Sequence, residues 1–190
     1  MNIKKPKGMT LIELLVAAAI TVLITSFIAT TLIISLKYWK IIDLKSEVQL
    51  NAMVGIEGLK QDISSSNIGS FTVNSSYPKA VSFQSALYNG QFYANADGTP
   101  AWQTYIIYYL AANTTDLRKR EIYSPGAIAP LSQPALVSYC DGTGVLKAID
   151  VNDFSAALGS DYVDILIKTR MDYKGSENST SLTMRVYPKN

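Results

Sequence analysis

Apolar residues follow two contrasting patterns along this chain. The first is a predominantly apolar run from Leu14 to Leu36 that contains no charged side chain. A run of this length exceeds the roughly 20 residues that an α-helix needs to cross a bilayer, so it predicts a membrane-spanning helix. After about residue 70 the second pattern begins, in which apolar and polar residues alternate over short segments typical of β-strands.

The apolar run continues into an amphipathic segment. Apolar positions recur at spacings of three, four and seven residues, the pattern of one helix face. Its members are Ile34, Tyr38, Ile41, Ile42, Val48, Ala52, Met53, Ile56, Leu59 and Ile63. The polar stretch 64–67, followed by Gly69, predicts the helix end. We therefore expect one helix from Met9 to Ile63, with its first half in lipid.

The alternating segments predict an antiparallel sheet. Two hairpins are expected, one with strands at 102–110 and 117–123, and one with strands at 162–171 and 181–187 around a loop at 174–180. Weaker strand candidates lie at 80–84, 136–140 and 145–149. Since about 120 residues suffice for one core, we expect an α+β fold whose β-sheet head packs on the C-terminal half of the long helix.

The residues in front of the apolar run are unusual. Lys4, Lys5 and Lys7 precede Gly8, and Glu13 stands five residues after that glycine. A charged side chain costs roughly 2.5–3.5 kcal/mol at the centre of a membrane helix, so a carboxylate at the membrane entry needs a functional reason. The lysines predict a cytoplasmic N-terminus, because positive charge is retained on that side. At the other end of the run, Tyr38 and Trp39 resemble an aromatic belt at the membrane interface, and packing on the globular head is the alternative role of these side chains.

Residues 7–16, Lys-Gly-Met-Thr-Leu-Ile-Glu-Leu-Leu-Val, resemble the leader of type IV prepilins and of the pseudopilins of type II secretion. The resemblance implies that a prepilin peptidase cuts between Gly8 and Met9 and that the new amino group of Met9 is methylated. Met9 departs from the Phe that more often begins mature chains of the family. The resemblance also implies the type IV pilin fold, and that Glu13 pairs with the terminal amine of a neighbouring subunit during assembly.

Short matches in the head resemble one subgroup, the J-type pseudopilins and W-type minor pilins. They lie at Leu59–Ile63, Leu117–Arg120 and Arg185–Asn190. The subgroup implies a minor subunit. Tip pseudopilins of the K type lack the glutamate that stands here at Glu13, so we expect this chain to lie beneath another subunit.

The resemblance also implies partners, location and a division of the chain. The partners are other pilins or pseudopilins through the N-terminal helix, the prepilin peptidase, the inner-membrane assembly platform and membrane lipid. We expect a single-pass inner-membrane protein with an extracytoplasmic head, which later joins a surface or periplasmic filament. The expected parts are a removed leader at 1–8, a membrane and assembly segment at 9–36, a soluble helix segment at 37–66 and a β-rich head at 67–190.

Composition argues against an enzyme and against a cofactor or metal site. The chain has no histidine, the commonest general base and metal ligand, and its one cysteine is Cys140. We expect Cys140 to be a buried small hydrophobe in a strand. The acidic segment at 150–153 lacks the glycine and distal glutamate of a calcium loop. We therefore interpret Asp150, Asn152 and Asp153 as solvated turn residues rather than as calcium ligands. Arg118–Arg120 carries too few cations for a nucleic-acid site.

Two classes of function stay open at this point. One is a structural subunit of a type IV pilus, a type II secretion pseudopilus or a DNA-uptake pilus. The other is a membrane-anchored extracytoplasmic adhesin or sensor that does not polymerise. An ordinary signal peptide cut near Ala19 fits less well, because Glu13 would lie in its apolar core and the run continues far beyond Ala19.

Overall fold

The computed structural model describes residues 9–111, 113–126, 129–173 and 176–188. The chain divides into two compact units between Asp43 and Leu44. The leader expected at 1–8, with Gly8, lies outside the described residues.

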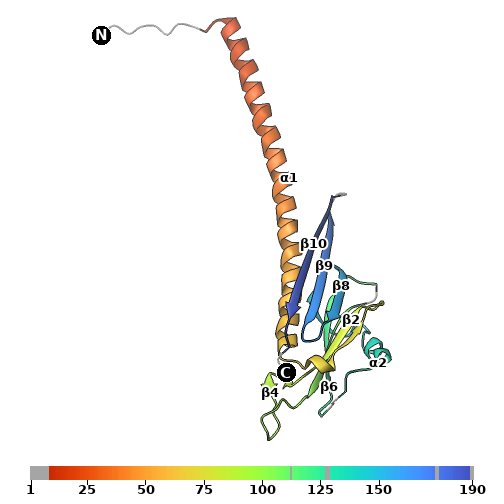
Figure 1. Cartoon of the computed structure of the whole chain (residues 1–190). Helices are drawn as coiled ribbons and strands as arrows, with labels where there is room; N and C mark the ends of the chain where they lie inside the picture. The colour runs from red at the N-terminus through yellow and green to blue at the C-terminus, as the bar shows by residue number, and fades with distance from the viewer. Residues whose placement is uncertain (1–8, 112, 127–128, 174–175, 189–190) are drawn as a thin grey trace, which may run out of the picture. The chain divides into compact units, whose positions relative to one another are not determined.

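Helix α1 runs from Leu11 to Ser64 and confirms the long helix predicted from Met9 to Ile63 (Figure 1). Its N-terminal part carries exposed apolar side chains, such as Leu23 at 71% and Phe27 at 74%. Within the described residues it is the one helix that is long and apolar enough to cross a membrane. It ends where predicted, because the hydroxyls of three consecutive serines donate to carbonyls three residues earlier, from Ser64 to Gln61, Ser65 to Asp62 and Ser66 to Ile63.

Threonines in the apolar part of α1 satisfy their hydroxyls within the helix. Thr21 donates to the carbonyl of Ala17 at 2.8 Å, and Thr25, Thr30 and Thr31 likewise donate to carbonyls four residues earlier. In hydrocarbon an unpaired hydroxyl would cost free energy, so this back-bonding lets polar residues remain in a membrane helix.

The described residues of the head form three antiparallel sheets rather than one. A five-stranded sheet has the order β1-β2-β5-β6-β7, with β1 at Thr72–Asn74, β2 at Ala80–Ser85, β5 at Thr104–Leu110, β6 at Leu117–Tyr123 and β7 at Val145–Ala148. A three-stranded sheet has the order β10-β9-β8, with β8 at Val151–Leu158, β9 at Val163–Tyr173 and β10 at Ser176–Val186. The smallest sheet pairs β3, Leu87–Tyr88, with β4, Gln91–Phe92. Two short helices complete the head, a 3₁₀ turn at Ile68–Ser70 and α2 at Gln133–Ser138.

Several strand predictions are confirmed and others are wrong. The hairpin β5–β6 and the candidates at 80–84 and 145–149 are confirmed. The loop predicted at 174–180 is too long, because β10 already begins at Ser176. Of the strand predicted at 136–140, residues 136–138 instead form the end of α2, and Tyr139 and Cys140 follow that helix. The helix starts after its N-cap Ser132 and has a proline in its first turn, a position that proline favours. The turn predicted for the acidic segment at 150–153 is confirmed at Asp150, which has a φ of 58° just before the strand, and is wrong at Asn152 and Asp153, which lie in β8.

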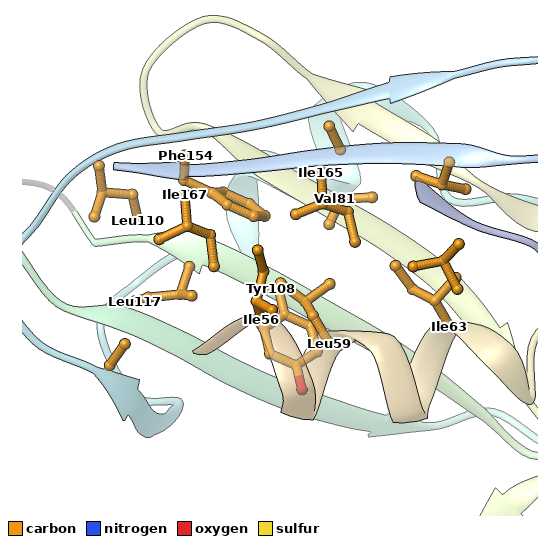
Figure 2. Close-up of a cluster of buried hydrophobic side chains, with 14 of the residues drawn as sticks. Ile56, Leu59, Ile63, Val81, Tyr108, Leu110, Leu117, Phe154, Ile165 and Ile167 are labelled. Carbon is orange, nitrogen blue, oxygen red and sulfur yellow. The ribbon is translucent and has the colours of Figure 1, made fainter. Parts of the chain in front are cut away.

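The core of the head forms between α1 and both larger sheets (Figure 2). Helix residues Ala52, Ile56, Leu59 and Ile63 meet buried side chains of the strands, among them Val81, Phe83, Tyr108, Leu117, Phe154, Ile165 and Ile167. Gly55 lies on the same helix face, and a Cβ there would stand 3.1 Å from the Cβ of Ala148. The helix therefore approaches the strands closely at this position. This arrangement of a long apolar helix followed by antiparallel sheets is α+β and matches the type IV pilin fold expected from the sequence.

The acidic residue Asp153 ties strands together instead of lying in a solvated turn. Its carboxylate pairs with Lys79 at 2.5 Å and with Lys168 at 3.4 Å. The hydrogen bond from Lys79 is the main cause that lowers the pKa of Asp153. This stabilising contribution is therefore present above the ordinary carboxyl pKa of about 3.9 and is lost as the pH falls below it. Among the described residues no group of acidic side chains or cysteine is arranged to hold a metal ion.

Candidate functional site

The helix start at Thr10 and Glu13 forms a reciprocal cap. The backbone N–H of Thr10 donates to Glu13 Oε2 at 2.8 Å, and the hydroxyl of Thr10 donates to the same oxygen at 2.9 Å. In return, the N–H of Glu13 reaches Thr10 Oγ1 at 3.4 Å. Since α1 begins at Leu11, Thr10 is the N-cap and Glu13 the third helical residue, which is the geometry of a capping box.

This cap explains how a carboxylate is tolerated at the entry to the apolar segment. The oxygen Oε2 of Glu13 accepts two hydrogen bonds, and the positive end of the helix dipole stabilises a negative charge in the first turn. The other oxygen, Oε1, accepts no hydrogen bond from any described residue. The side chain is thus stabilised within its own chain and still presents one oxygen to an incoming cation.

Thr10 enters the sequence-based prediction only as part of the leader motif, and its capping role comes from the structure. A signal for this role exists in the sequence, because a Ser or Thr followed three residues later by a Glu or Gln before an apolar run is typical of a capping box.

We expect replacement of Thr10 by Val to weaken the first turn of α1. Loss of an N-cap hydroxyl typically costs about 1 kcal/mol, which corresponds to a roughly 5-fold faster exchange of the first-turn amides. Hydrogen exchange of the full chain in lipid nanodiscs measures this, with Thr10→Ser as the control that keeps the hydroxyl. Equal exchange in all three proteins would show that the cap contributes nothing.

The predicted membrane interface falls on helical residues with large exposure. Tyr38 is 63% and Trp39 71% exposed, and both are part of α1. The bounding residues Leu14 and Leu36 of the predicted membrane segment are likewise exposed, at 61% and 65%. Exposure of these side chains agrees with a lipid contact, and their role as an interface belt stays a prediction.

A polar network joins the end of α1 to the five-stranded sheet. Asp62 Oδ2 accepts a hydrogen bond from the Tyr108 hydroxyl at 2.6 Å and pairs with Lys119 Nζ at 2.7 Å, while Lys119 also contacts Glu121 at 2.8 Å. Burial and the nearby Asp62 raise the pKa of Tyr108. Burial opposes the charge on Lys119, but its hydrogen bonds to Asp62 and Glu121 outweigh this and leave its pKa raised. The network brings together Leu59–Ile63 and Leu117–Arg120, two of the three matches that resemble the J- and W-type subgroup.

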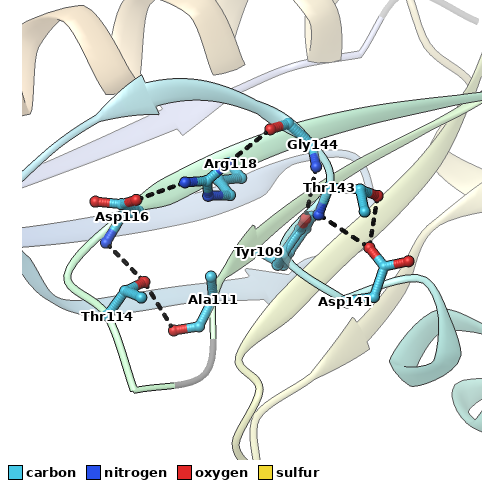
Figure 3. A network of polar contacts seen from close by, with 8 residues as sticks. All are labelled: Tyr109, Ala111, Thr114, Asp116, Arg118, Asp141, Thr143 and Gly144. Atoms are coloured by element: carbon cyan, nitrogen blue, oxygen red, sulfur yellow. Dashed lines mark hydrogen bonds and ion pairs between the residues drawn. The ribbon is translucent and has the colours of Figure 1, made fainter.

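The neighbouring arginines of β6 are likewise engaged inside the head. Arg118 donates to Asp116 at 2.7 Å and to the carbonyl of Gly144 at 3.1 Å (Figure 3). Arg120 pairs with Asp141 at 2.7 Å. These arginines therefore fix the segment between α2 and β7, and a bound phosphate would have to compete with their carboxylates.

Cys140 is a buried thiol just after helix α2 and not in a strand. It is 8% exposed, and its sulfur donates to the carbonyl of Leu136 at 3.3 Å. Burial raises the pKa of the Cys140 thiol to about 11, with a smaller contribution from Asp141. The prediction of a small buried hydrophobe is confirmed, while its predicted strand is wrong.

The raised pKa of Cys140 predicts slow thiol chemistry. Because the folded state favours the neutral thiol, its contribution to stability is present below the ordinary pKa of about 8.5 and is lost as the pH rises through about 11. At pH 8 we expect Cys140 to react with a disulfide reagent on the order of 100-fold more slowly in the folded protein than in urea. Similar rates in both states would contradict the burial.

Comparison with known families points to the same N-terminal segment. A family model described as the prokaryotic N-terminal methylation motif matches residues 3–29. No curated protein and no solved structure matches the chain.

The motif, the apolar helix and the α+β head together support a type IV pilin-like protein. The motif indicates a membrane-anchored subunit that is processed by prepilin peptidase and assembles in the manner of pilins. Proteins with this motif are structural subunits rather than enzymes.

Proposed function

We propose that this protein is a minor pilin or pseudopilin of a type IV pilus, a type II secretion pseudopilus or a DNA-uptake pilus. In this proposal the peptidase cuts between Gly8 and Met9, and Met9 becomes N-methylated. The mature chain is first anchored in the inner membrane with its head on the extracytoplasmic side, and then enters a filament through its N-terminal helix. The adhesin or sensor that never polymerises is the competing function.

The geometry at Glu13 carries this proposal. The carboxylate is held through Oε2 at the start of an apolar helix by Thr10, and among the described residues none donates to Oε1, which a charged amine could reach. An adhesin anchor needs only length, apolarity and a capped helix start, and an uncharged Gln would cap that start as well as a Glu does. A subunit that docks against the terminal amine of a neighbour needs the carboxylate, because two opposite charges in a low-dielectric core stabilise each other only as a pair.

The assignment to a minor subunit rests on the head. Asp62 and Lys119 belong to two segments that resemble J-type pseudopilins and W-type minor pilins, and they form one ion pair at 2.7 Å. The two short segments that resemble this subgroup, Leu59–Ile63 and Leu117–Arg120, are far apart in sequence but are joined by this ion pair. This joint role supports the subgroup more than either match does by itself.

Processing is tested by the N-terminus of the protein purified from cells that contain a working prepilin peptidase. We expect mass spectrometry of the N-terminal peptide to show a start at N-methylated Met9. Gly8→Leu should retain the leader, because the small residue before the cut is lost. Retention of residues 1–8 by the unchanged protein, or a start near Ile20, would support the anchored adhesin or sensor instead.

A further inference from the structure

One end of the head presents aromatic side chains to water. Phe92 is 58%, Tyr93 36% and Tyr123 55% exposed. The ring of Tyr123 lies 4.4 Å from that of Tyr88, measured between centroids. These residues belong to the β3–β4 hairpin and the adjoining end of the five-stranded sheet, near the label β4 in Figure 1. The hydrophobic core of the head is formed by other residues, so packing of that core does not account for them.

The loop beside this hairpin is held in one conformation by its own hydrogen bonds. Asn95 N–H donates to the carbonyl of Thr99 at 2.8 Å, and Thr99 N–H donates to Asp97 Oδ1 at 2.9 Å. Asn95 Nδ2 also donates to Thr99 Oγ1 at 3.0 Å. Ala101 N–H donates to the carbonyl of Tyr93 at 2.9 Å, which fixes the loop to the hairpin. A loop ordered in this way loses little entropy when it binds a ligand.

A hollow of about 540 Å³ lies against this loop. Its lining includes Asn95, Thr99, Pro100, Trp102, Gln103 and Gly126. This volume is in the range of small-molecule sites, roughly 300–1,000 Å³. All the described lining residues are uncharged, and they combine an indole ring with amide and hydroxyl groups.

This chemistry narrows the class of ligand. A phosphate or carboxylate ligand would need cations in the lining, and a metal ion would need carboxylates. A neutral sugar has apolar C–H faces that pack on aromatic rings, and hydroxyls that pair with amide groups. We propose that the hollow and its aromatic neighbours bind a neutral oligosaccharide. This activity is independent of filament assembly.

Intrinsic fluorescence tests this directly, because the chain has two tryptophans, Trp39 and Trp102. With excitation selective for tryptophan, the emission of the Trp39→Phe protein comes from Trp102. The full chain in lipid nanodiscs is titrated with chitotetraose, cellotetraose and maltotetraose. We expect at least one of these neutral sugars to shift the emission saturably. In Trp102→Phe, where Trp39 reports, we expect no shift.

Affinity measurements on further variants separate binding from folding. By calorimetry, Trp102→Ala should abolish detectable binding, and Gln103→Ala should weaken it about 10-fold, the loss expected for one polar contact. Replacing Gln103 should affect folding little, since among the described residues its side chain donates to the nearby Ala101 carbonyl and to no distant group. The control is Tyr187→Ala, which removes an aromatic ring that is 58% exposed and is not among the described residues that line the hollow. The proposal is overturned if none of the three sugars binds, or if Gln103→Ala and Tyr187→Ala bind as tightly as the unchanged protein.

Discussion

Replacing Glu13 by Ala is expected to leave the protein inserted in the membrane and to abolish its incorporation into filaments. Insertion depends on the apolar run from Leu14 to Leu36, which this change does not touch. Assembly depends on a carboxylate that neutralises the terminal amine of a neighbouring subunit. An amine left unpaired in a low-dielectric helix bundle costs several kcal/mol, enough to prevent a subunit from entering.

The capping box at Thr10 makes a sharper variant available. Glu13→Gln removes the charge but keeps an oxygen able to cap the helix, since Gln serves at this position of a capping box. If the charge is what matters, Glu13→Gln should fail to assemble as completely as Glu13→Ala. If Glu13→Gln assembles normally, then the role of Glu13 is to cap α1 and the pairing proposal is wrong.

Assembly is measured by separating filaments sheared from cells from the membrane fraction, with the protein detected in both. Membrane levels of the variants serve as the control for insertion and stability. Thr10→Val belongs in the same experiment, because it removes the cap and keeps the charge. We expect Thr10→Val to reduce assembly less than Glu13→Gln does.

Replacing Asp62 by Ala is expected to destabilise the head by about 3 kcal/mol, as breaking a largely buried ion pair does. The change leaves Lys119 with only the more exposed Glu121, and it deprives the Tyr108 hydroxyl of its partner. Because the pKa of Lys119 is raised, the stabilising contribution of this network is present below the ordinary lysine pKa of about 10.4 and is lost as the pH rises above it.

A double-mutant cycle that combines Asp62→Ala with Lys119→Met isolates the energy of the Asp62–Lys119 ion pair. The free energy of unfolding is measured by urea titration of the full chain in detergent, with tyrosine and tryptophan emission as the signal. The double variant should lose less stability than the two single variants added together. Lys60→Ala is the matched control, because the Lys60–Glu57 pair lies on the same helix with side chains 52% and 70% exposed, and such pairs contribute less than about 1 kcal/mol. Additive losses would indicate that Asp62 and Lys119 act independently.

Local patterns in the sequence predicted much of the fold. The apolar run and the stripe from Ile34 to Ile63 predicted α1 almost to the residue, because helix periodicity and the serine-rich stop are both local signals. Alternation predicted β5, β6 and the C-terminal part of β10, where Leu182, Met184 and Val186 pack toward the core. The leader motif likewise drew attention to Glu13, since a carboxylate at a membrane entry stands out without any structure.

The tertiary structure decided what local patterns left open. The segment 136–140 is compatible with a buried strand or a short helix, and packing beside β1 and β2 selects the helix that ends before Cys140. Asp153 looks like a turn residue until Lys79 and Lys168, distant in sequence, make its place in β8 favourable. The ion pair between Asp62 and Lys119 also connects residues far apart in the chain. The hollow beside Trp102 likewise brings Gly126 against residues of the segment 95–103. Such contacts depend on which strands become neighbours, and the periodicity of a single segment contains no information about its neighbours.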